Sequence, residues 1–158
     1  MKTIKGPGIF LAQFIGGQPP FNSLEGLADW AAGMGYKALQ IPCNHKAIFD
    51  LELAASSQTY CDEVRGVLVE RGLSISELST HLEGQLVAVH PAYDDAFDGF
   101  APAEVRGNPA QRQRWATQML MHAAKASQNL GLSAHATFSG ALAWPYLYPW
   151  PPHNAALL

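Results

Sequence analysis

The chain has 158 residues, of which 48% are apolar, and its formal net charge is −3. This length suits one domain with an ample core. The small negative charge, with no cluster of Lys or Arg, gives no electrostatic basis for binding nucleic acid or an anionic membrane. The apolar run at residues 9–12 is too short for a signal peptide or a membrane span, so we expect a cytoplasmic protein. Cys43 and Cys61 are then expected to be reduced thiols.

The first predicted elements are a strand at residues 8–14 and an amphipathic helix. Asn22 or Ser23 can cap the start of this helix, and Gly35 follows its end. The helical spacing i, i+3, i+4, i+7 is met by Leu24, Leu27, Ala28 and Ala31.

The order helix, glycine, strand occurs three times along the chain. Gly35 precedes a predicted strand at residues 38–42, Gly72 precedes one at 74–79, and Gly131 precedes one at 132–138. Glycine suits the left-handed position that ends a helix. The second and third helices are indicated by apolar residues at helical spacing, namely Tyr60, Val64, Val67 and Leu68, then Trp115, Met119, Ala123 and Ala126.

This alternation predicts an α/β fold with four parallel strands in chain order and right-handed crossovers. We expect one domain over residues 1–158, a partial TIM barrel of about four of the eight βα units. An open doubly wound sheet is the alternative, and the absence of G-x-G-x-x-G after the first strand weakens its dinucleotide-binding version.

Polar residues alternate with apolar ones along several of these strands. An open parallel sheet, covered on both faces, usually reads as continuously apolar, whereas a barrel can open into a polar site at its C-terminal mouth. From their shared parity we predict that five side chains converge on one concave face: Gln13, Gln40, Glu77, His81 and Thr137. Alternatively, these polar side chains form hydrogen bonds with one another inside the core.

His81 follows the third predicted strand, where barrel enzymes place active-site side chains. A histidine there can bind a sugar hydroxyl or phosphate, ligate a metal or move a proton, or it can simply bond its own loop. Glu83 either pairs with His81 or is solvated.

The fourth strand and the residues after it supply further candidates. Thr137 and Ser139 lie near the expected mouth of the barrel and can contact a polyhydroxy ligand. We expect His135 to be a buried structural histidine that is hydrogen-bonded to a neighbour such as Glu77. Trp144 and Trp150, in a proline-rich segment, can stack on a sugar ring or form a hydrophobic plug. Of the other histidines, we expect His45 at the surface, His122 in a structural helical stripe with Trp115 and Met119, and His153 exposed in the tail, while the role of His90 is open.

Residues 79–107 form a long predicted βα loop on the active face. Tyr93, Phe97 and Phe100 let it pack as a lid or wall, while the acidic stretch that begins at Asp94 fails the calcium-loop pattern at its third and twelfth positions. The chain contains no G-x-S-x-G, P-loop, H-E-x-x-H or zinc-ligand spacing.

Four segments resemble the N-terminal half of the sugar phosphate isomerase/epimerase family, which has the xylose-isomerase-like TIM barrel. They are residues 8–14, 58–65, 77–85 and 134–140, and the resemblance extends to about Pro152. It implies an isomerase or epimerase that acts on a sugar or sugar phosphate. We take Gln40, His81, Glu83, Thr137, Ser139 and Trp144 as candidate substrate-binding residues.

The resemblance also implies a divalent metal, Mn, Mg or Zn, in the complete family barrel. Its acidic and histidine ligands, and the carboxylates that move the proton, come from later strands than this chain contains. We therefore expect a truncated or naturally split barrel that binds no metal tightly and is inactive alone. His81 matches a histidine that related barrels place after their third strand.

Two other functions remain open. One is a non-catalytic half-barrel that assembles with itself or with a partner half through open sheet edges. The other is an abasic-site endonuclease-like barrel, which the lack of basic patches disfavours.

Overall fold

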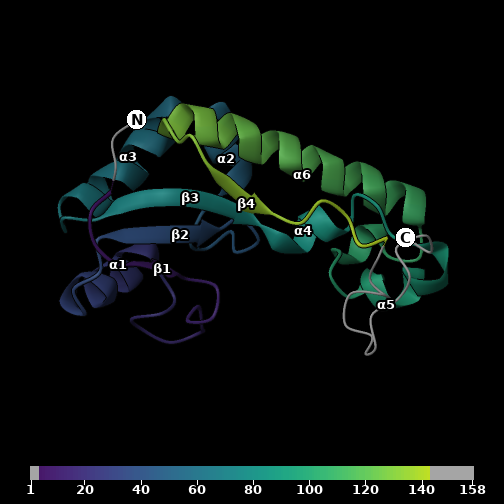
Figure 1. Cartoon of the computed structure of the whole chain (residues 1–158), viewed down its shortest axis with the longest axis horizontal. Coiled ribbons are helices and arrows are strands. Elements are labelled where there is room, and N and C mark those ends of the chain that lie inside the picture. The colour runs from purple at the N-terminus through teal and green to yellow at the C-terminus, as the bar shows by residue number, and fades with distance from the viewer. Residues whose placement is uncertain (1–3, 143–158) are drawn as a thin grey trace. The chain divides into compact units, whose positions relative to one another are not determined.

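The computed structural model describes residues 4–142, which divide into two compact units (Figure 1). The sheet unit contains the residues up to Thr80 together with Met119–Ala136. The helical unit contains His81–Gln118 and, of the described residues, 137–142. Each unit has its own cluster of buried apolar side chains.

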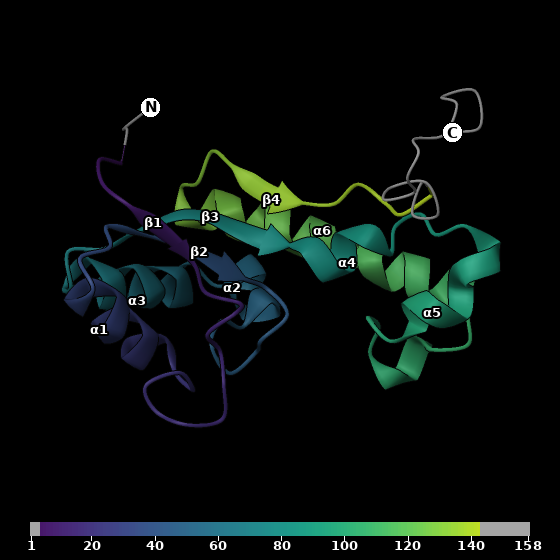
Figure 2. The same ribbon diagram turned by 60° about the horizontal axis from the view of Figure 1, so that its bottom comes forward.

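The sheet unit is built on a four-stranded parallel sheet in chain order, as the sequence predicted (Figure 2). The strands are β1 (Gly8–Phe10), β2 (Ala38–Pro42), β3 (Ser74–Thr80) and β4 (His135–Thr137). Parallel neighbours require crossover connections, and helices supply them here. The α/β class with a partial βα repeat is therefore confirmed.

Helices α1 (Leu24–Gly33), α2 (Leu51–Ser56), α3 (Gln58–Val69) and the second half of α6 (Pro109–Leu130) complete the sheet unit. Ser23 caps α1 by accepting a hydrogen bond from Gly26 N at 3.1 Å, as the sequence predicted. The glycines that follow α1, α3 and α6 have left-handed φ values of 88°, 67° and 71°, at Gly35, Gly72 and Gly131.

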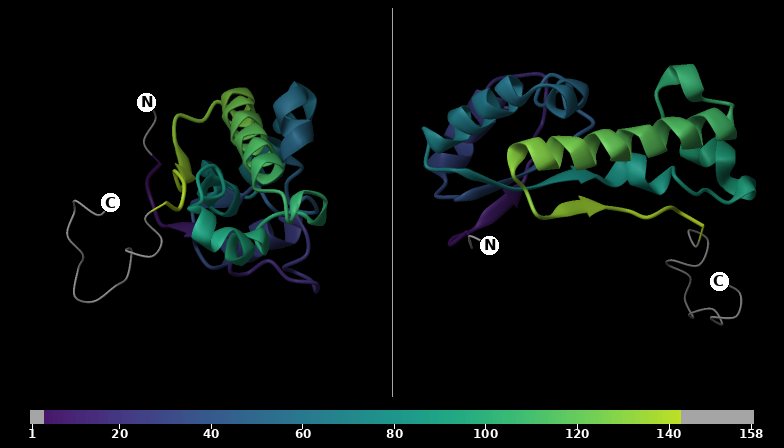
Figure 3. Two further views of the ribbon diagram at one scale, coloured as in Figure 1. Left: turned by 90° about the vertical axis from the view of Figure 1, so that its right-hand side faces the viewer. Right: turned by 90° about the horizontal axis from the view of Figure 1, so that it is seen from above.

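One face of the sheet forms the main core. Leu39, Ile41 and Leu78 are fully buried there, in one cluster with apolar residues of α1, α3 and α6. Figure 3 shows α3 and the second half of α6 on the same side of the strands. Helices gathered on one side of a parallel sheet are the arrangement of a barrel wall.

The first and last strands are shorter than predicted. Leu11 N still donates to Gln40 O at 3.1 Å, but Phe14 N donates back to Leu11 O at 2.9 Å, so the chain turns. Gln13 therefore lies exposed in a turn after β1. Before β4, Leu132 N donates to Ser127 O at 2.8 Å, which closes the end of α6 and delays the start of the strand.

The helical unit contains short helical segments where the sequence predicted a loop. They are α4 (His81–Gln85), η1 (Pro91–Tyr93), α5 (Asp94–Asp98) and η2 (Ala103–Val105), followed by the first half of α6. Phe97, which is 2% exposed, packs with Leu86, Ala101 and Ala116. The predicted packing of Phe97 is confirmed, while Phe100 stays exposed.

Arg112 holds the helical unit together through ionic hydrogen bonds. Its side chain is almost fully buried, and its Nη1 donates to Asp94 O at 2.8 Å and to Asp98 Oδ1 at 2.5 Å. Its Nη2 donates to Asp94 Oδ1. The acidic stretch that failed the calcium-loop pattern therefore binds a guanidinium. Among residues 4–142, no helix combines the length and apolar character needed to cross a bilayer.

Candidate functional site

Two of the five residues predicted to converge are neighbours on the sheet. Gln40 of β2 pairs in register with Glu77 of β3, and both side chains are half-buried on the face opposite Leu39 and Leu78. A β-bulge between the partners of Leu39 and Gln40 inserts one extra residue into β3. This part of the predicted polar face is confirmed.

His135 lies on the other face of the sheet. Its Nε2 is 2.7 Å from Thr80 Oγ1, and Thr80 has the parity of Leu78 rather than that of Glu77. His135 also lines a hollow with Leu120 and Ala124 of α6, on the helix-covered side. The structural role expected for His135 fits this position, and Thr80 is a hydrogen-bond partner of its ring.

In the helical unit, α4 lies beside the segment that follows β4. Gly140 N donates to Gly84 O at 2.9 Å, and Ala141 N donates to Ala88 O at 2.6 Å. A Cβ atom at Gly84 would stand 2.2 Å from Thr137 Oγ1 and 2.3 Å from Phe138 O. Only a residue without a side chain permits this approach, so Gly84 sets the contact between the two segments.

This contact gathers four of the predicted substrate-binding residues on two adjoining segments. His81 and Glu83 lie on α4; Thr137, the last residue of β4, and Ser139, two residues later, lie opposite. The ring of His81 meets the ring of Phe138 edge-on, with centroids 5.1 Å apart. Thr137 and Ser139 are exposed, and Thr137 Oγ1 donates to Phe138 O at 3.0 Å.

Glu83 is buried, with 4% of its surface exposed, so the solvated alternative is wrong. Desolvation raises the pKa of this carboxyl above its ordinary value, and a hydrogen bond from its own backbone N–H offsets part of that rise. No salt bridge to Glu83 is formed within residues 4–142. A carboxyl whose pKa is raised in this way keeps its proton to a higher pH than an exposed glutamate does, which suits a group that takes up and returns a proton.

The remaining candidates lie elsewhere. Gln40 belongs to the sheet unit, and Trp144, Trp150 and His153 lie outside the described residues. His90 accepts a hydrogen bond from Ala92 N at 3.2 Å and so caps η1.

A metal of the kind the resemblance implies does not fit the described residues. Tight divalent sites use at least three protein ligands with nitrogen, sulfur or oxygen donors. In residues 4–142 there is no group of three or more His, Cys, Asp or Glu side chains placed to hold an ion. His81 and Glu83 together supply only two such groups, so we assign no chemical step to a metal held by these residues.

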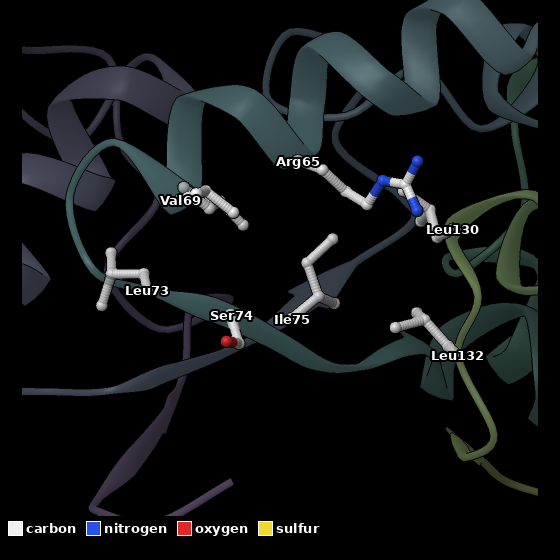
Figure 4. Close-up of a pocket in the computed structure, with 8 residues that line it drawn as sticks. Arg65, Val69, Leu73, Ser74, Ile75, Leu130 and Leu132 are labelled. Atoms are coloured by element: carbon white, nitrogen blue, oxygen red, sulfur yellow. The ribbon is translucent and has the colours of Figure 1, made fainter. Parts of the chain in front are cut away.

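Two other features were not predicted from the sequence. The first is the buried side chain of Arg112, which two aspartates one turn apart in α5 could have signalled. The second feature is an apolar hollow of about 190 Å³ between α3, the start of β3 and the end of α6. Figure 4 shows Val69, Ile75 and Leu132 around it. It lies at the N-terminal end of β3, where barrels carry stabilising rather than catalytic residues.

The comparisons with known proteins give no assignment. No protein-family model matches the sequence, and no curated protein matches it.

Proposed function

We propose that this chain is a sugar or sugar phosphate isomerase/epimerase-like protein, and that α4 and residues 137–139 hold its polyhydroxy substrate. The observation that carries the proposal is the buried carboxyl of Glu83, two residues after His81, on a helix that starts where β3 ends. The parallel βα order supports it as well, because such folds bind ligands at the carboxyl ends of their strands.

Each residue has a chemical part in this proposal. The hydroxyls of Thr137 and Ser139 are exposed and can exchange hydrogen bonds with sugar hydroxyls. His81 is half-buried, its ring contacts that of Phe138 edge-on, and it can donate to a carbonyl or hydroxyl oxygen. Glu83, with its raised pKa, can carry the proton that moves between adjacent carbons.

The charge that develops on the substrate oxygen in such a proton transfer needs a stabilising group. In the family this is a divalent metal, and residues 4–142 do not form its ligand set. We therefore propose that this chain binds the sugar and does not turn it over alone.

The test measures binding and turnover separately. D-fructose and D-fructose 6-phosphate are titrated into the ¹⁵N-labelled chain, and exchange of their carbon-bound hydrogens in D₂O is followed by ¹H NMR. We expect binding in the millimolar range, weakened at least about fivefold in His81→Ala and unchanged in the control His45→Ala, which lies in the sheet unit. No exchange is expected. If His81→Ala and wild type bound the sugar with equal affinity, or if neither bound it, the proposed site would be wrong.

A second candidate is a non-catalytic half-barrel that assembles with another copy. The observation that favours it is the strand order, in which β1 and β4 are the end strands of the sheet within the described residues. Unpaired strand edges promote association. Sedimentation of the purified chain, together with the sugar titration, distinguishes the two proposed functions. A stable dimer that binds no sugar would support only the non-catalytic half-barrel.

A further inference from the structure

Phe138 places an exposed aromatic ring beside the residues proposed to hold the sugar. The residue is 52% exposed, although its backbone is packed against α4. Phe138 N and Phe138 O both lie within 2.9 Å of the position that a Cβ atom at Gly84 would take, and Phe138 O accepts a hydrogen bond from Thr137 Oγ1 at 3.0 Å. The exposed surface of Phe138 therefore belongs mainly to its ring.

The ring of His81 covers only part of the ring of Phe138. The two ring centroids are 5.1 Å apart, and the ring planes are inclined at 63° to each other. In such an edge-on pair one ring points its edge at the other, so His81 covers at most one face of Phe138. Because half of the residue is exposed, the remaining ring surface is accessible to a ligand.

The groups around this ring indicate what it can bind. Thr137 and Ser139 flank Phe138 in the chain and are both exposed, and His81 adds an imidazole. Hydroxyls and imidazoles exchange hydrogen bonds with the hydroxyls of a sugar. The face of an aromatic ring carries partial negative charge and attracts the weakly positive C–H groups of a ligand. A pyranose offers both kinds of contact, because its C–H groups lie on the ring faces and its hydroxyls project from the rim.

We propose that the site binds the closed pyranose form of its sugar, with one C–H face of the sugar ring stacked on Phe138. This inference rests on the proposed sugar site and adds the residue that selects the form of the sugar. An open-chain polyol carries similar hydroxyls but presents no flat face of C–H groups, so it loses the contact with Phe138 and binds more weakly.

The experiment compares methyl β-D-glucopyranoside, whose ring cannot open, with D-glucitol, an open-chain polyol of the same carbon skeleton. Each is titrated at pH 7 into the ¹⁵N-labelled full chain. We expect the glucoside to bind with a dissociation constant of about 1–10 mM, as its few atoms allow, and D-glucitol to bind at least about fivefold more weakly. Selective saturation of the aromatic protons should reach the C–H protons on one face of the glucoside more strongly than those on the other face.

Substitutions at two exposed phenylalanines of the helical unit locate the contact. Phe138→Leu keeps an apolar side chain but removes the aromatic ring, so it should weaken the glucoside at least about threefold and abolish its preference over D-glucitol. Phe138→Trp should bind the glucoside at least as tightly as wild type. Phe100→Leu is the matched control and should leave both affinities unchanged.

The outcomes separate this inference from the proposed function. Equal affinity of Phe138→Leu and wild type for the glucoside, or equal binding of the glucoside and D-glucitol, would overturn the stacking on Phe138. If binding were still lost in His81→Ala, the sugar site itself would stand. Binding of the glucoside that requires Phe138 but not His81 would support the stacking and contradict the proposed function, and no binding of either probe would contradict both.

Discussion

Replacing Arg112 by leucine removes the cation that Asp94 and Asp98 share. The guanidinium makes two hydrogen bonds to carboxylates and one to a backbone carbonyl, and its side chain is 2% exposed. Breaking a buried ion pair from one side costs about 3–5 kcal/mol. The two carboxylates remain 25% and 17% exposed and can be rehydrated, so we expect the lower end, about 3 kcal/mol.

The loss should be local to the helical unit. Native-state hydrogen exchange and urea unfolding of Arg112→Leu measure it, and the amides around Phe97 and Ala116 should lose protection while those of β2 and β3 keep it. Arg114→Leu, at an exposed position two residues further along α6, is the control and should lie within about 0.5 kcal/mol of wild type. If Arg112→Leu and Arg114→Leu were equally stable, the role assigned to this ion cluster would be wrong.

Two further predictions concern α4. Gly84→Ala should destabilise the chain by about 1–3 kcal/mol in urea unfolding, because the new methyl group meets a backbone oxygen at 2.3 Å. The control is Gly66→Ala in α3, which has open space around it and should be neutral or stabilising. Equal effects of the two substitutions would contradict the close contact at Gly84. Glu83→Gln should be more stable than wild type at pH 8 and equal to it near pH 4. The pKa of Glu83 is raised in the folded state, so wild type loses stability as pH rises above the ordinary value of about 4.3; a stability difference that does not change with pH would contradict this.

The repeat of helix, glycine and strand was readable from the sequence because each step has a local physical cause. Gly35, Gly72 and Gly131 take left-handed φ values at helix ends, and the strands after Gly35 and Gly72 match the predicted ranges within one residue. Alternation within β2 and β3 also placed Gln40 and Glu77 correctly on one face.

The register between strands could not be predicted from the sequence. Parity fixes which residues of one strand share a face, but the bulge in β3 and the pairing of Thr80 with His135 decide which faces match across strands. Short helices such as α4 and α5 span too few residues to show a period of 3.6. The burial of Glu83 and Arg112 is a tertiary effect, and neither residue differs in the sequence from a solvated charge.

The ionisation of Glu83 tests the central claim most directly. The side-chain carboxyl carbon of Glu83 can be followed by ¹³C NMR from pH 3 to 9, with and without D-fructose. The proposal predicts a midpoint above about 4.3, the ordinary pKa of glutamate, and a change in that midpoint when the sugar is present. A carboxyl that titrates near 4.3 and does not respond to the sugar would contradict both the burial of Glu83 and its place in a substrate site.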